Sequence, residues 1–138
     1  MQRIITAIVA VATLAGCHTH QVLLRDAAPV PAERTEVSEF LHPAEGTQAI
    51  AVIRDGGSYK SMGYTVIWID GEKVAALNTS EAVTLYLPPG KHIVTTGMRV
   101  LGAENMMGPT LPINAPSKIT KYRISWNSAG MLIQPAIE

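Results

Sequence analysis

Apolar and polar residues alternate along several short stretches in the last two thirds of the chain. In residues 83–87, valine and leucine occupy every second position and threonine and tyrosine fill the positions between them. A period of two is typical of a β-strand that buries one face. Residues 65–69 are apolar on both faces, which predicts a strand at the centre of a sheet. Further strands are expected at residues 49–54, 73–77, 92–100, 122–126 and 131–134.

Turn residues separate these stretches. Asp70-Gly71 lies between two expected strands, and it suits a type I′ hairpin turn because both central residues of that turn need a positive φ angle. Pro88-Pro89-Gly90 predicts a type II turn, and residues 127–130 predict another turn. About seven short strands without a convincing amphipathic helix predict an all-β fold, a small antiparallel β-sandwich.

The first 16 residues differ in character from the rest. They contain one basic residue, Arg3, followed by an apolar run over residues 4–15 that ends in small residues. This run is shorter than the roughly 20 residues of a membrane-spanning helix, and its order of features is that of a secretory signal peptide. We therefore predict that residues 1–16 are a cleaved signal peptide and take no part in the fold.

Leu14, Ala15, Gly16 and Cys17 end this segment, and the tetrapeptide resembles the lipobox of bacterial lipoproteins. The resemblance implies that diacylglycerol is attached to the Cys17 sulfur, that the chain is cut before Cys17, and that the new amino group is acylated. Cys17 is the only cysteine, so an intramolecular disulfide is excluded. Three acyl chains exceed what stable anchoring to the lipid bilayer needs. The alternative is an ordinary secreted protein with a free cysteine near its start.

His18, and not aspartate, follows the expected lipidation site. In enterobacterial lipoproteins an aspartate here is the usual signal for retention in the inner membrane. The resemblance therefore implies a location in the periplasmic leaflet of the outer membrane, with the periplasmic face of the inner membrane as the alternative.

Residues 17–46 contain three prolines and scattered charges. Pro29-Val-Pro31 favours extended backbone. We expect the lipidated N-terminus and a flexible tether over 17–46, followed by one domain over 47–138. The sequence does not decide whether residues 32–41 of the tether form a short helix.

Landmarks of the expected domain together resemble a known family. They are Ile53-Arg54, the strand that ends in Asp70-Gly71, the Leu87-Pro-Pro-Gly-Lys-His92 segment and a late strand with Tyr122. They resemble small bacterial lipoproteins of unknown function with a PEGA-like domain, which is akin to the β-sandwiches of carboxypeptidase regulatory domains. The resemblance covers roughly residues 49–133, implies a fold and brings no catalytic residue. Residues 101–116 depart from it, because they form a longer loop than the family pattern leads us to expect.

Composition narrows the possible functions. Eleven basic residues balance eleven acidic ones, so no excess of positive charge is available to bind nucleic acid. Residues 57–61 lack the spacing of a phosphate-binding loop, and no Gly-x-Ser-x-Gly turn of a hydrolase is present. We therefore expect no enzyme, no catalytic residue, no cofactor and no small-molecule substrate.

Histidines are the remaining candidates for a metal site. His18, His20 and His42 lie on the expected tether, and a metal bound there would have to overcome the full ordering entropy of a flexible segment. We expect no metal site and solvated tether histidines.

The 101–116 loop is rich in apolar residues for a connection in a small domain. Methionine adapts to irregular surfaces, so Met106, Met107 and Leu111 form a possible partner-binding site. The alternative is a loop that folds over an open end of the sandwich and caps its core.

These features together predict a non-enzymatic, lipid-anchored periplasmic protein. It is expected to act through contacts with an envelope protein, as an accessory or structural subunit of an envelope assembly. The alternative is a periplasmic inhibitor or immunity-type lipoprotein that blocks a partner enzyme. An inhibitor would bind one soluble enzyme tightly, whereas a subunit would migrate with large membrane complexes.

Replacing Cys17 by serine is expected to prevent lipid attachment, because only a thiol can form the thioether. Cell fractionation and the gel mobility of the product measure this effect. A Cys17→Ser protein that matures and partitions with membranes as the unchanged protein does would contradict the predicted anchor.

Overall fold

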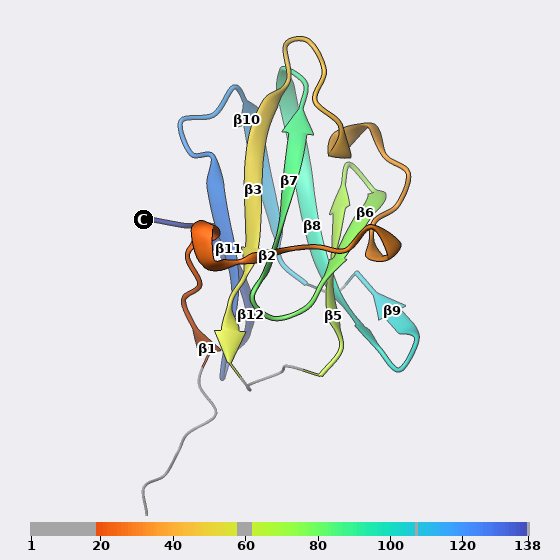
Figure 1. The fold of residues 1–138 in the computed structure, drawn as a ribbon, viewed down its shortest axis with the longest axis vertical. Coiled ribbons are helices and arrows are strands. Elements are labelled where there is room, and N and C mark those ends of the chain that lie inside the picture. The colour runs from red at the N-terminus through yellow and green to blue at the C-terminus, as the bar shows by residue number, and fades with distance from the viewer. Residues whose placement is uncertain (1–18, 58–61, 107, 138) are drawn as a thin grey trace, which may run out of the picture.

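The structure is a computed structural model that describes residues 19–57, 62–106 and 108–137, and it consists mainly of two β-sheets packed face to face (Figure 1). The first, the β8 sheet, has the order β10 (Thr110–Ala115), β8 (Gly90–Val100), β5 (Tyr64–Ile69) and β6 (Glu72–Leu77), with β9 (Ala103–Asn105) paired to β8. The second, the β3 sheet, has the order β12 (Gly130–Pro135), β11 (Lys121–Asn127), β3 (Gln48–Arg54), β7 (Glu81–Leu87) and β2 (Ala28–Pro29). All seven expected strands are present, which confirms the all-β sandwich.

The turns explain why neighbouring strands pair as they do. Asp70 and Gly71 have φ angles of 51° and 85°, as a type I′ turn requires, and they join β5 to β6. Most strand pairs are antiparallel, but β11 runs parallel to β3 and β2 runs parallel to β7. These two pairs are not joined by hairpins: β11 reaches β3 after the chain has crossed over from β10 in the opposite sheet.

The core lies between the two sheets and follows the predicted alternation. Ile50 and Val52 of β3 and Leu85 and Leu87 of β7 are buried against Ile67 of β5. Each such side chain contributes about 1.5–3 kcal/mol by leaving water. Residues of β11 alternate as expected, with Tyr122 and Ile124 in this core.

The prediction of a loop over residues 101–116 is wrong for most of this segment. It forms β9, a turn-linked partner of β8, and then β10, the outer strand of the β8 sheet. Pro112 lies on β10, and proline is tolerated in an outer strand because one edge of that strand makes no ladder hydrogen bonds. Proline and polar residues on β10 conceal its alternation, although Ile113 is buried in the core.

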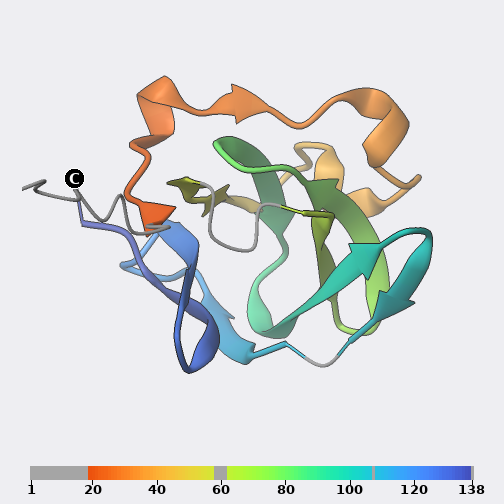
Figure 2. The same cartoon turned by 90° about the horizontal axis from the view of Figure 1, so that it is seen from below.

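Residues 19–46, which we call the N-terminal strap, pack on the sandwich over the length expected to be a flexible tether. Figure 2 shows the strap running along one side of the two sheets. β1 (Thr19–His20) pairs with β4 (Gly56–Gly57), and β2 extends the β3 sheet beside β7. Val22 is buried against Ile53 and Ala82, so the strap covers the outer face of the β3 sheet.

The second half of the strap joins the two sheets. Arg34 donates to both carboxylate oxygens of Glu81 on β7, at 2.6 and 2.5 Å. Glu36 N–H donates to the Val74 carbonyl of β6 at 2.9 Å, and Phe40 is buried in the main core. The strap therefore closes the side of the sandwich where β7 and β6 lie opposite each other.

The short helix considered for residues 32–41 does not form. Two 3₁₀ turns, η2 (Ala32–Arg34) and η3 (Glu39–Leu41), occupy this stretch, and a third, η1 (Leu24–Asp26), lies earlier in the strap. Short turns allow the chain to change direction between its contacts with β7 and β6, which a straight helix would not.

The ion pair between Arg34 and Glu81 shifts the pKa of both groups. Burial raises the pKa of Glu81, but hydrogen bonds from Arg34 and from the Asn78 N–H lower it by more, so the resulting pKa is below its ordinary value. The hydrogen bond to Glu81 raises the pKa of Arg34. The pair is therefore fully charged at neutral pH.

Replacing Arg34 by alanine is expected to lower the free energy of unfolding by about 1–3 kcal/mol, because Glu81 keeps its charge in a largely buried site. Urea unfolding of the protein in detergent measures the change. Arg25→Ala is the matched control, since the Arg25 side chain is 79% exposed, and its effect should be within about 0.5 kcal/mol.

The effect of Arg34→Ala should also depend on pH. The folded-state pKa of Glu81 lies below its ordinary value of 4.5, so the ion pair stabilises the fold above that pH. This stabilisation is lost as the pH falls through the folded-state pKa. The difference between the two proteins should therefore shrink on acidification, and a difference that stays constant would contradict the assigned role of the pair.

Candidate functional site

The residues expected to carry the lipid lie at the beginning of the chain. Leu14, Ala15, Gly16 and Cys17 are outside the described residues, and so is Met107. The described chain begins at Thr19 in β1, two residues after Cys17. The Thr19 hydroxyl donates to the Trp126 carbonyl at 2.9 Å, which fixes β1 to the end of β11.

The structure separates the other two residues of the predicted partner-binding loop. Met106 is about half exposed on the connection between β9 and β10. Leu111 lies on β10 and packs partly against the core. Partner binding by Met106 and Met107 stays a prediction.

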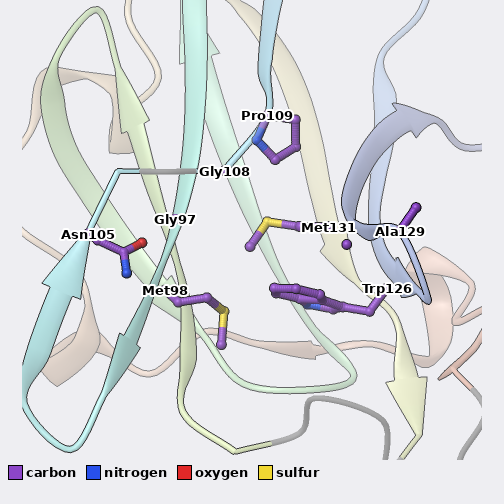
Figure 3. A pocket seen from close by; sticks show the side chains of 9 residues that line it. Gly97, Met98, Asn105, Gly108, Pro109, Trp126, Ala129 and Met131 are labelled. Carbon is purple, nitrogen blue, oxygen red and sulfur yellow. The ribbon is translucent and has the colours of Figure 1, made fainter.

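A pocket of about 560 Å³ opens at the end of the sandwich where β8, β9 and the β11–β12 hairpin meet (Figure 3). Met98, Trp126 and Met131 give it an apolar lining, and Asn105 and Pro109 form part of its rim. Sequence analysis missed Met98 and Met131 as site residues. Trp126 was detectable only as the last inward position of β11.

Two glycines allow one wall of the pocket to form. A Cβ atom at Gly97 would lie 1.8 Å from the Asn105 carbonyl oxygen, and one at Gly108 would lie 2.5 Å from the Thr96 carbonyl oxygen. Both positions therefore require glycine, because the segment around β9 packs directly on the backbone of β8. Glycine is needed at these positions because two backbone segments approach each other closely, and not because of its conformational freedom.

The chemistry of the pocket suits binding. The described residues that line it include no ionisable side chain. Trp126 Nε1 is buried and has no hydrogen-bond acceptor among the described residues, although a buried indole N–H usually finds one. The pocket therefore offers two thioethers and an indole ring, which fit an apolar group.

Asp70 and His92 form the most conspicuous pair of titratable side chains, and both hold turns. His92 Nδ1 lies 2.7 Å from Asp70 Oδ2, and His92 Nε2 lies 2.9 Å from the Pro88 carbonyl oxygen. The Ile93 N–H donates to Asp70 Oδ1 at 2.7 Å. Desolvation raises the pKa of Asp70, but the hydrogen bonds from Ile93 and His92 lower it by more. The resulting pKa is below its ordinary value. The Asp-Gly turn and the Pro-Pro-Gly-Lys-His segment are thus bonded to each other.

Other buried charges also hold the scaffold. Asp55 is buried and accepts hydrogen bonds from Arg123 on β11 and from the Val22 N–H of the strap. Arg54 donates to the carbonyl oxygens of Gly63 and Leu77 at 3.0 and 2.8 Å. Burial lowers the pKa of Arg54 to about 10, so it stays protonated at neutral pH.

The histidines considered for a metal site are now placed in part. His20 lies on β1, His42 follows η3, and His18 is outside the described residues. In the described part of the chain, no three His, Cys, Asp or Glu side chains are grouped to hold a metal ion.

Comparison with known proteins bears on the N-terminus. The family described as prokaryotic membrane lipoprotein lipid attachment site matches residues 1–17. This match supports a bacterial lipoprotein that is anchored to a membrane through a lipid on Cys17. No curated protein and no solved structure matches the chain. Over residues 19–57, 62–106 and 108–137, no helix has the length and apolar character needed to cross a membrane.

Replacing Asp70 by alanine is expected to lower the free energy of unfolding by about 1–3 kcal/mol, because the Ile93 N–H and His92 lose their acceptor. Asp70→Asn should cost less, since asparagine tolerates a positive φ angle and keeps one acceptor oxygen. Chemical unfolding measures both variants, with Glu72→Ala at an exposed position as the control. Equal losses for alanine at 70 and 72 would contradict the structural role of Asp70.

Proposed function

We propose that this lipoprotein is a non-catalytic accessory or structural subunit of a bacterial envelope assembly, acting in the periplasm through protein contacts. The single observation that carries the proposal is the open pocket of Met98, Trp126 and Met131, which lies at the same end of the sandwich as the start of the described chain. The lipid attachment site supports a fixed place on a membrane. The lack of aspartate after Cys17 supports the outer membrane as that place.

The side chains of the pocket are of the kind that protein interfaces use. Methionine adjusts its shape to different partners, and tryptophan is enriched among the residues that dominate binding energy. An apolar partner side chain would fill the space between the two thioethers.

The neighbouring strand indicates how the partner approaches. β12 begins at the pocket and is the outer strand of the β3 sheet, paired only to β11 among the described strands. Outer strands present free N–H and C=O groups to which an extended chain can add. We therefore propose that the partner contributes an extended segment, which pairs along β12 and places one apolar side chain in the pocket.

The carboxylates that accept hydrogen bonds within the fold support a structural and binding role over catalysis. Asp70, Asp55 and Glu81 are each bonded to groups that hold turns or the strap in place. Their disposition is consistent with a rigid support for a binding surface. The resemblance to small lipoproteins with a PEGA-like domain, which brings no catalytic residue, agrees with this proposal.

Crosslinking in cells tests the proposal. A photoreactive amino acid at Met131, in the full-length protein, should give a defined product with one envelope protein that migrates in a large membrane complex. The same amino acid at Val37, a fully exposed position on the strap, is the matched control and should not give that product. Met98→Glu should abolish the product, because a carboxylate would be desolvated when a partner fills the pocket, and a thermal melt of this variant checks that the fold is retained.

Two results would overturn the proposal. One is an identical set of products from positions 131 and 37, which would mean that the pocket selects no partner. The other is a product with a single soluble enzyme whose activity is blocked, which would establish the inhibitor or immunity-type alternative.

A further inference from the structure

The folded N-terminal strap leaves almost no spacer between the lipid and the domain. Cys17 is two residues before Thr19, whose backbone pairs with Gly57 and whose hydroxyl is bonded to Trp126. Two residues extend the chain by at most about 7 Å. Acyl chains on Cys17 lie in the bilayer, so the end of the sandwich that carries β1 is held at the membrane surface.

This end of the sandwich exposes a group of large apolar side chains. Of the eight large hydrophobic side chains that are exposed among the described residues, three lie just before β5 and at the β8–β9 turn. They are Met62 (73% exposed), Val100 (37%) and Leu101 (97%). Figure 1 shows the β8–β9 turn and the start of β5 at the same end of the molecule as β1, and Figure 2 views this end directly.

Leu101 is the most informative of the three because the fold gains nothing from its side chain. Leu101-Gly102 joins β8 to β9 with φ angles of 49° and 81°, nearly those of Asp70-Gly71 in the β5–β6 turn. The first position of such a turn favours asparagine, aspartate or glycine, and a leucine there is strained. At Asp70 the strained backbone is offset by hydrogen bonds from the side chain to the scaffold, whereas the apolar side chain of Leu101 points into solvent. Backbone strain that no contact within the fold offsets indicates a role in an interaction.

Charges around this turn are paired with each other. Arg99 and Glu104 flank it and lie 2.8 Å apart, and Glu104 also lies 3.6 Å from Lys73. The apolar tip is therefore bordered by compensated charge. Such a surface suits the interface of a bilayer without depending on anionic lipid.

We propose that Met62, Val100 and Leu101 form a docking face that inserts into the interface of the lipid bilayer in which the protein is anchored. The proposal rests on the lipid anchor at Cys17 and goes beyond it, because it fixes the orientation of the domain. The anchor keeps the docking face at a high local concentration beside the bilayer, so a small apolar contact is sufficient. The domain then lies on the membrane with β1 and the β8–β9 turn facing the lipid, and with the β5–β6 turn facing away.

A spin label measures this orientation. The sulfur of Cys17 is used by the lipid, so a cysteine introduced elsewhere is the only free thiol. Leu101→Cys and Ile119→Cys are each labelled in the full lipidated protein, in vesicles of neutral phosphatidylcholine. Ile119 is also exposed and lies on the β10–β11 connection at the opposite end of the sandwich (Figure 1).

At position 101, collisions of the label with oxygen, which concentrates in lipid, should exceed collisions with a water-soluble nickel chelate several-fold. At position 119 the ratio should be reversed. Adding Met62→Asp to the Leu101→Cys protein should move the label at 101 into water. Met62 is exposed, so this variant should keep the thermal melt of the unchanged protein, and Cys17 should keep it in the vesicle fraction.

The outcomes separate the docking face from the anchor. A protein absent from the vesicle fraction would show that the anchor itself, and with it the proposed function, is wrong. A vesicle-bound protein whose labels at 101 and 119 are equally accessible to the nickel chelate would overturn the docking face alone. A label at 101 that is shielded from both reagents would also overturn it, because a second copy of the chain and not lipid would then cover the face.

Discussion

The closure of the sandwich by the N-terminal strap is the constraint on which the other features depend. Two stacked sheets leave an open side, and here Phe40 of the strap is buried in the core with its ring 5.9 Å from that of His92, while Arg34 binds Glu81 on β7. The same strap covers the outer face of the β3 sheet and brings β1 to the end of β11. A chain that would otherwise be a spacer thus becomes part of the domain, and the lipid attachment site is brought next to the folded protein.

The central part of the fold can be predicted from the sequence because its strands and turns are determined by neighbouring residues. Alternation over residues 83–87 needs only the pleat of a strand, and Asp70-Gly71 needs only the positive φ angles of a hairpin turn. The strap could not be predicted in this way. Val22 and Phe40 begin apolar runs of only two or three residues that show no period, and the partners that bury them lie far along the chain. Proline and charge in this stretch, which indicated a flexible tether, are equally compatible with an extended segment lying against a sheet.

The candidate site likewise has one part that could be predicted from local sequence and one part that could not. The residues around Cys17 are recognisable because the lipidating chemistry acts on a short, contiguous sequence, and the comparison supports that part. The pocket is assembled from Met98 on β8, Trp126 on β11 and Met131 on β12, which belong to opposite sheets. No spacing rule connects these positions. Only the crossover from β10 to β11 brings them to one end of the molecule.

The order in which the strap finds its partners bears on how the protein is made. Residues 19–46 leave the ribosome before β4, β6 and β7, the strands that they bind. The strap therefore cannot close the sandwich until those strands have been synthesised, so the side that it covers is the last one for which all parts are present.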